Sequence, residues 1–180
     1  GYKYLFAVLA PANLYLDVAI DLAVEKNDGK PVTVAMAFEQ DAFSQDVRLG
    51  VLEAIDRTGS KKVIDDKLPK ELNDMAATLA KVKAVKPDVL VVSGHTKGAL
   101  TAVRQIAEMK VDVPMLAMTD TGGAVANGFL NAKGVQVVIL YPKGKVSEIQ
   151  EKQLTTLGNN ITALEVDGVF DDCQEMVKSA

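Results

Sequence analysis

Short apolar runs separated by amphipathic segments repeat along the whole chain. Their starts lie roughly 20–30 residues apart, the length of a strand, a crossover helix and two loops. Runs such as Val89–Val92 are apolar on both faces, which is typical of parallel strands covered by helices on each side. We therefore predict strands at Tyr4–Ala10, Val32–Phe38, Lys62–Asp66, Val89–Ser93, Met115–Met118, Val135–Tyr141 and Ile161–Val166.

The segments between these runs carry apolar residues at every third or fourth position, as the buried face of a helix requires. Three such faces are Val47 with Val51 and Ile55, Met75 with Leu79 and Val82, and Leu100 with Val103 and Ile106. Strands that alternate with helices in this way predict an α/β fold. We expect one domain over residues 1–180, with a doubly wound, mostly parallel sheet in a three-layer α/β/α arrangement. Its strand order should be flavodoxin-like or Rossmann-like.

The amino-acid composition excludes some classes of binding partner. The 180 residues are 48% hydrophobic and 24% charged, an ordinary mixture for a globular domain. The net charge of −4 and the pI near 5.1 provide no basic field, so we expect neither nucleic acid nor a membrane as a partner. No apolar run approaches the ~18 residues of a membrane span. With one cysteine, Cys173, and one histidine, His95, we expect no internal disulfide and no Cys-rich or His-rich metal site.

Three stretches in the first part of the chain share the pattern of one known family. KYLFAVLAPA (residues 3–12) is an extended opening segment, and VTVAMAFEQDAFSQD (32–46) joins a strand, an acidic loop and an aromatic residue before a helix. AVKPDVLVVSG (84–94) is a Pro-Asp strand that ends in small residues. Together they resemble one lobe of a periplasmic solute-binding protein of the leucine/isoleucine/valine type. The resemblance covers roughly residues 2–118.

The remaining residues, 119–180, follow a different pattern. DTGGAVANGF (120–129), VVILYPKGKVSEIQEKQLTTLG (137–158) and DGVFDDCQ (167–174) resemble threonine synthase, a pyridoxal-phosphate enzyme of another α/β architecture. In that family a Thr-Ser-Gly-Asp-Thr-Gly motif holds substrate and cofactor. Asp120, Thr121 and Gly122 match it, but Met118 and Thr119 stand where the Ser-Gly pair would be. The family's Phe-Lys-Asp lysine motif and its later glycine-rich loop are missing, so we expect no cofactor.

The two resemblances together predict a chimera. We expect an engineered α/β scaffold, lobe-like over 1–118 and threonine-synthase-like over 119–180, that has no natural catalytic activity and is not an enzyme. The alternative is an isolated lobe of a periplasmic amino-acid-binding protein that keeps weak affinity for an amino acid or small carboxylate. A lobe surface left exposed would favour a homodimer. The sequence leaves the localisation unknown, because one parent is periplasmic and the other cytoplasmic. For an engineered chain we expect recombinant expression in the cytoplasm.

Candidate ligand-binding residues follow the carboxyl ends of the predicted strands, where sites of doubly wound sheets lie. Phe43 matches the aromatic position that lines the cleft of the solute-binding family, and His95 follows a Ser-Gly turn. A lone histidine in such a turn is more often an exposed loop residue than a ligand. Residues 120–122 open a helix and could receive an anion, although a helix cap with a tight turn is the favoured alternative. The candidate set is Phe43, Ser93, His95, Asp120, Thr121 and Gly122.

One acidic pair, Asp65 and Asp66, belongs to a predicted strand. Neighbours in a strand point to opposite faces. We therefore expect no shared carboxylate site at these two residues.

Overall fold

The computed structural model describes residues 11–119, 137–142 and 161–166. The predicted strand at Tyr4–Ala10 lies outside these ranges. The described elements follow one another in the order η1 (Ala12–Leu14), α1 (Asp17–Lys26), β1 (Thr33–Glu39), α2 (Ala42–Thr58), β2 (Lys61–Leu68), α3 (Ala76–Val85), β3 (Val89–Ser93), α4 (Thr96–Glu108), β4 (Met115–Met118), β5 (Val137–Pro142) and β6 (Ile161–Val166).

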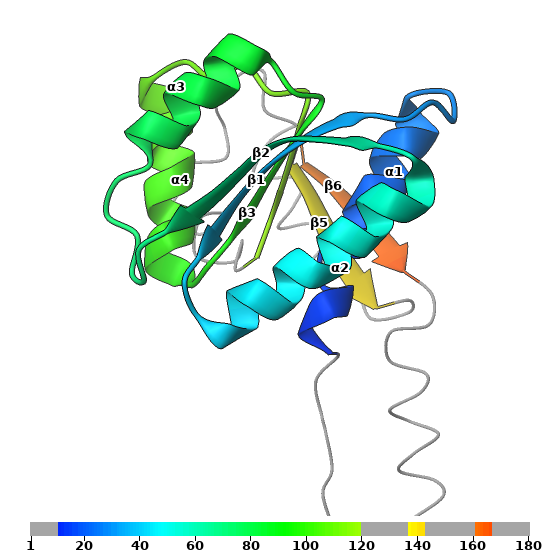
Figure 1. The fold of residues 1–180 in the computed structure, drawn as a ribbon, viewed down its shortest axis with the longest axis horizontal. Helices are drawn as coiled ribbons and strands as arrows, with labels where there is room; N and C mark the ends of the chain where they lie inside the picture. The colour runs from blue at the N-terminus through cyan, green and yellow to red at the C-terminus, as the bar shows by residue number, and fades with distance from the viewer. Residues whose placement is uncertain (1–10, 120–136, 143–160, 167–180) are drawn as a thin grey trace, which may run out of the picture.

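The described strands form one parallel sheet of six in the order β2-β1-β3-β4-β5-β6 (Figure 1). The first five follow the flavodoxin-like order, so the predicted doubly wound α/β fold is confirmed. The chain moves outward from β1 to β2, then returns to the other side of β1 and continues through β3 to β6. The topological switch point therefore lies between β1 and β3.

Helices cover both faces of the sheet. In β1, Val34, Met36 and Phe38 point to the face covered by α1 and α2, while Ala35 and Ala37 point to the face covered by α3 and α4. Figure 1 shows these two pairs of helices on opposite sides of the strands. The predicted helical faces are buried in these two cores, with Leu100 only partly so. The β1 and β3 loops consequently lead into helices on opposite faces, which opens the edge between them.

Two carboxylates of β2 confirm that strand neighbours face apart. Asp65 accepts hydrogen bonds from Arg48 of α2, at 2.8 Å from Nε. Asp66 accepts from the Thr78 hydroxyl at 2.7 Å and from Lys81 at 2.9 Å, both on α3. The Arg48 hydrogen bond lowers the Asp65 pKa to about 2. Each residue ties the edge strand to the helix on its own face, so they form no shared site.

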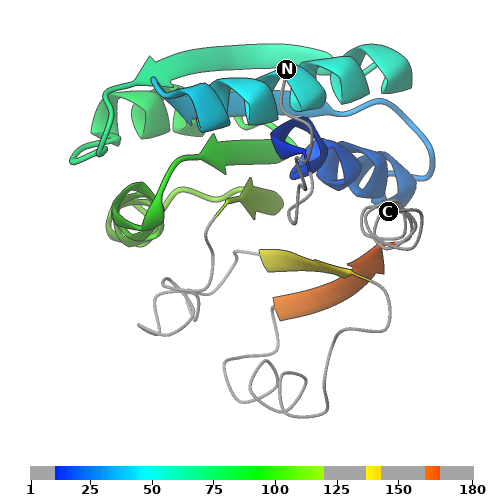
Figure 2. The same ribbon diagram turned by 90° about the horizontal axis from the view of Figure 1, so that it is seen from below.

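Strand pairing continues past β4. Leu116 of β4 pairs with Val137 of β5, and β5 then pairs with β6 over its whole length, from Val137 with Ile161 to Pro142 with Val166. Figure 2 shows β5 and β6 extending the sheet at the edge opposite β2. Within the described ranges, none of the helices has the length and apolarity needed to cross a membrane.

Candidate functional site

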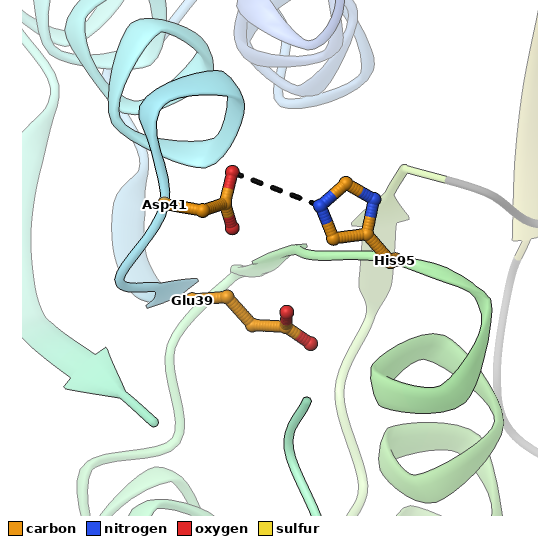
Figure 3. Close-up of side chains that lie close together, drawn as sticks. All are labelled: Glu39, Asp41 and His95. Atoms are coloured by element: carbon orange, nitrogen blue, oxygen red, sulfur yellow. Dashed lines mark ion pairs between the residues drawn. The ribbon is translucent and has the colours of Figure 1, made fainter. Parts of the chain in front are cut away.

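The loops after β1 and β3 meet at the switch point and bring together residues far apart in the sequence. Glu39, Asp41 and Phe43 come from the first loop and the start of α2, and His95 from the second loop. Figure 3 shows Asp41 and His95 facing each other with the Glu39 carboxylate beside them. This edge is where ligands of doubly wound sheets bind. It is therefore the candidate site of the described part of the chain.

Glu39 is a buried carboxylate at the end of β1. The residue is only 1% exposed. The Oε2 atom accepts a hydrogen bond from the Glu71 backbone N–H at 3.3 Å, whereas Oε1 has no hydrogen-bond partner among the described residues. Gly94 and Gly98 leave room for this carboxylate, because a Cβ at either position would overlap Oε1. The β3 loop and the start of α4 are thus shaped around the Glu39 side chain.

Asp41 is the N-cap residue of α2. Its Oδ1 accepts from the Ser44 backbone N–H and its Oδ2 from the Ser44 hydroxyl, both at 2.9 Å. These bonds satisfy a free N–H of the first helical turn and fix the carboxylate in place. The same Oδ1 lies 3.8 Å from Nε2 of His95. The His95 side chain is 59% exposed and makes no capping bond to its own helix, α4.

Three rings lie in a row at this edge. Tyr15 contacts Phe43 edge-on, with centroids 5.3 Å apart and planes at 88°. Phe43 contacts His95 with centroids 5.9 Å apart and planes at 30°. The row offers a partly exposed aromatic surface beside the two carboxylates.

The structure brings two of the predicted site residues together and separates a third from them. Phe43 and His95 are in ring contact, and His95 is exposed as expected of a loop histidine. Ser93 is buried, and its Oγ has no partner among the described residues. Asp120, Thr121 and Gly122 lie outside the described residues, so their role stays a prediction. Glu39 and Asp41 were missed, and the signal for Glu39 was an acid that directly ends an apolar run.

Thr119 joins the ends of β3 and β4. Its buried hydroxyl donates to the Gly94 carbonyl at 2.7 Å and accepts from the Gly94 N–H at 3.0 Å. A side chain without a hydroxyl would leave both backbone groups unpaired. Thr119 therefore holds the β3 loop at the site.

Comparison with solved structures defines the class of fold. The chain is similar to a solute-binding protein of an ABC transporter from R. palustris in complex with benzoate, with a TM-score of 0.60 and 16% identity over 81% of this chain and 40% of that chain. An extracellular ligand-binding receptor from Verminephrobacter eiseniae matches with a TM-score of 0.58 and 15% identity, over 87% of this chain and 45% of that chain. At such identities the likeness concerns the fold alone. The chain has the fold of a solute-binding-protein lobe.

Comparison with curated sequences shows a second similarity. Over 61 residues, 34% of this chain, it is 61% identical to threonine synthase of Buchnera aphidicola subsp. Acyrthosiphon pisum. Over 87 residues, 46% of this chain, it is 46% identical to threonine synthase of Serratia marcescens. The chain spans 14% and 20% of the length of these enzymes. No family model matches it. The predicted dual resemblance is confirmed: a threonine-synthase-like segment occurs in a chain with the fold of a solute-binding protein.

Proposed function

We propose that the chain is an engineered chimera that serves as an α/β scaffold and has no catalytic activity of its own. The observation that carries the proposal is the presence of two unlike sources in one continuous parallel sheet. A segment 61% identical to threonine synthase covers only 14% of that enzyme, while the fold neighbours across most of the chain are solute-binding proteins. A fragment of one enzyme joined to a lobe of another architecture is the expected product of recombination between folds.

The strands on both sides of the junction are parallel, and β4 and β5 are apolar runs typical of strands covered by helices on both faces. Leu116 of β4 pairs with Val137 of β5, so backbone hydrogen bonding continues from one part to the other. The strands before and after the junction therefore belong to one sheet.

Two residues of this chain replace the Ser-Gly pair of the enzyme family's motif. Thr119 stands where that motif has Gly, and Met118 where it has Ser. The Thr119 hydroxyl both donates to and accepts from Gly94, so it is committed to the backbone of the β3 loop. Lys97, one of the described lysines near the carboxyl ends of the strands, is paired with Glu71 at 3.7 Å on the surface. The loss of the Ser-Gly pair and this pairing of Lys97 support a chain without catalysis.

Two measurements on the full chain test this proposal. The first follows threonine formation in the presence of pyridoxal phosphate, with an intact threonine synthase as the positive control, and we expect no product and no borohydride-reducible colour. The second follows urea unfolding by far-UV circular dichroism and by hydrogen exchange in peptides from 1–118 and 119–180. We expect one cooperative transition shared by both parts. Threonine production, or two separate transitions, would contradict the scaffold proposal.

A second candidate function is weak binding of a small carboxylate at the switch point. The observation that favours it is the row of Tyr15, Phe43 and His95, which offers ring faces and a donor at the edge where the fold binds ligands. The solute-binding protein of R. palustris named above holds benzoate. A ligand on this single edge keeps much of its surface in water, so its affinity should be low.

Thermal unfolding with benzoate, leucine and phenylalanine tests this second candidate. A ligand at about a hundred times its Kd adds about 2.7 kcal/mol to the unfolding free energy. Phe43→Ala should abolish the shift in midpoint. The matched control is Leu49→Ala on the same helix, because Leu49 is 52% exposed and lies outside the ring row. If no compound moves the midpoint, the scaffold has no such ligand site.

A further inference from the structure

Glu39, Asp41 and His95 form a group that neither proposed function uses as a unit. One potential ligand atom from each residue lies within 4.8 Å of the other two (Figure 3). The set comprises two carboxylates and one imidazole. Two of the three are held in place, because Glu39 is buried under the β3 loop and Asp41 is bonded to Ser44. His95 is exposed and is the residue free to adjust.

The unpartnered Oε1 of Glu39 is a second, independent observation at this group. A buried carboxylate oxygen normally has a hydrogen bond or a cation beside it, because removing its water is costly. Among the described residues, no lysine or arginine forms an ion pair with Glu39, and Lys97 is paired instead with Glu71. Oε1 nevertheless occupies the space that a side chain at Gly94 or Gly98 would fill. A cation bound between Glu39, Asp41 and His95 would give this buried carboxylate a partner.

We propose that Glu39, Asp41 and His95 bind one divalent transition-metal ion of the zinc type. An imidazole nitrogen with two carboxylate oxygens suits Zn²⁺, whereas Mg²⁺ and Ca²⁺ prefer all-oxygen sites. Bonds of about 2.0–2.2 Å to the metal require the three atoms to approach more closely than 4.8 Å. A rotation of the exposed His95 side chain supplies much of that approach. Three protein ligands leave a fourth position for water at the solvent side.

This inference goes beyond the proposed scaffold and the proposed carboxylate site. It depends only on the loops after β1 and β3, so it holds whether or not the chain was engineered. It also makes a different prediction from ligand binding on the ring row. Removing Phe43 should abolish a carboxylate site but leave metal binding intact.

The test is a titration of the tag-free full chain with Zn²⁺, followed by isothermal calorimetry and by NMR of the imidazole. The chain contains one histidine, so every imidazole signal belongs to His95. We expect one Zn²⁺ per chain and a change in the His95 ring nitrogen shifts that saturates at the same ratio. His95→Ala and Glu39→Gln should each weaken Zn²⁺ binding by more than about tenfold. Losing a residue that only supports a metal ligand typically costs about tenfold or more, and these two residues are ligands themselves.

Two control variants separate this site from others. Glu71→Gln alters a nearby carboxylate whose side chain is 75% exposed, and it should leave Zn²⁺ affinity unchanged. Cys173→Ser removes the single thiol and should also have no effect. If Glu39→Gln does not fold, Asp41→Asn and the His95 signals of the unaltered chain give the same answer. The proposal is overturned if Zn²⁺ does not bind one to one, if His95 signals do not respond, or if Cys173→Ser abolishes binding.

Discussion

The fit between Glu39 and the start of α4 leads to a prediction that a pair of substitutions can test. Gly98 is the third residue of α4, and a Cβ there would overlap Oε1 of Glu39 and lie 3.4 Å from Cβ of Leu72. In Gly98→Ala the Glu39 carboxylate must therefore move within a filled interior. Forcing an extra methyl into such a space costs about 1–3 kcal/mol. Alanine returns up to about 1 kcal/mol as the better helix former.

The net expectation for Gly98→Ala is a loss of up to about 2 kcal/mol in unfolding free energy, because the gain in helix propensity offsets part of the cost of the extra methyl. In the background Glu39→Ala the obstructing carboxylate is gone, so the new methyl enters the space that it occupied. Gly98→Ala should then be neutral or stabilising. The coupling energy between the two positions should be about 2 kcal/mol, within the range for residues in direct contact.

Urea unfolding of the four proteins in this cycle measures the coupling. For a chain of this length, each 1 kcal/mol also moves the thermal midpoint by about 2–4 °C. The m-value should be the same in all four, because none of the changes alters the surface exposed on unfolding. If Gly98→Ala costs the same free energy in both backgrounds, the cost arises elsewhere and our account of the Glu39 environment is wrong.

Three further predictions concern other contacts of the described structure. Thr119→Val keeps the shape of the side chain but leaves the Gly94 N–H and carbonyl unpaired. Urea unfolding should therefore show a loss of about 1–3 kcal/mol in unfolding free energy. Thr119→Ser keeps the hydroxyl and should lose less. Gly50→Ala places a methyl against the backbone carbonyl of Asn13, so the thermal midpoint should fall by several degrees, at about 2–4 °C per kcal/mol. The lowered Asp65 pKa stabilises the fold above the unfolded value of 3.8, and this contribution is lost as the pH falls through about 2. In acid titrations followed by circular dichroism, Asp65→Asn should therefore be less stable than the parent at pH 6, by about 1–2 kcal/mol after solvent screening, and the two should converge near pH 2. A constant difference at all pH values would show that Asp65 acts through shape and not through charge.

The strands of the sheet were predictable to different degrees, for reasons that lie in their surroundings. β3 and β4 have the predicted bounds because their apolar runs are buried and end abruptly. β6 also has the predicted bounds, although Thr162 and Glu165 interrupt its apolar run. β2 extends from Lys61 to Leu68, beyond the predicted Lys62–Asp66. β2 is an edge strand whose exposed residues are charged, so its apolar residues do not mark where the strand begins and ends. An edge position does not decide the outcome by itself, because β6 is the other edge strand and has the predicted bounds. The central strand β1 is shifted by one residue, to Thr33–Glu39 from the predicted Val32–Phe38.

The candidate site was predictable where a residue's type stood out and not where its role depends on a distant partner. Phe43 and His95 follow strands that the sequence placed at one edge, and they are in ring contact. Glu39 resembles an ordinary loop acid until Gly94 and Gly98 are known to lie over it. That contact joins residues more than fifty positions apart, and no local pattern encodes it. The ligand-binding roles of Asp120, Thr121 and Gly122 remain predictions.

The order of the strands also bears on how such a chain can be altered. β1, β3 and the residues Glu39, Asp41, Phe43 and His95 at their ends all lie within residues 33–119, and Tyr15 adds the outer ring of the row from residue 15. β5 and β6 are added at one margin, two strands away from the switch point or more. Because β5 and β6 are added at one edge of the sheet, they can be replaced without changing the residues at the switch point. New segments grafted after Gly122 should therefore leave the residues from Glu39 to His95 at the switch point in place.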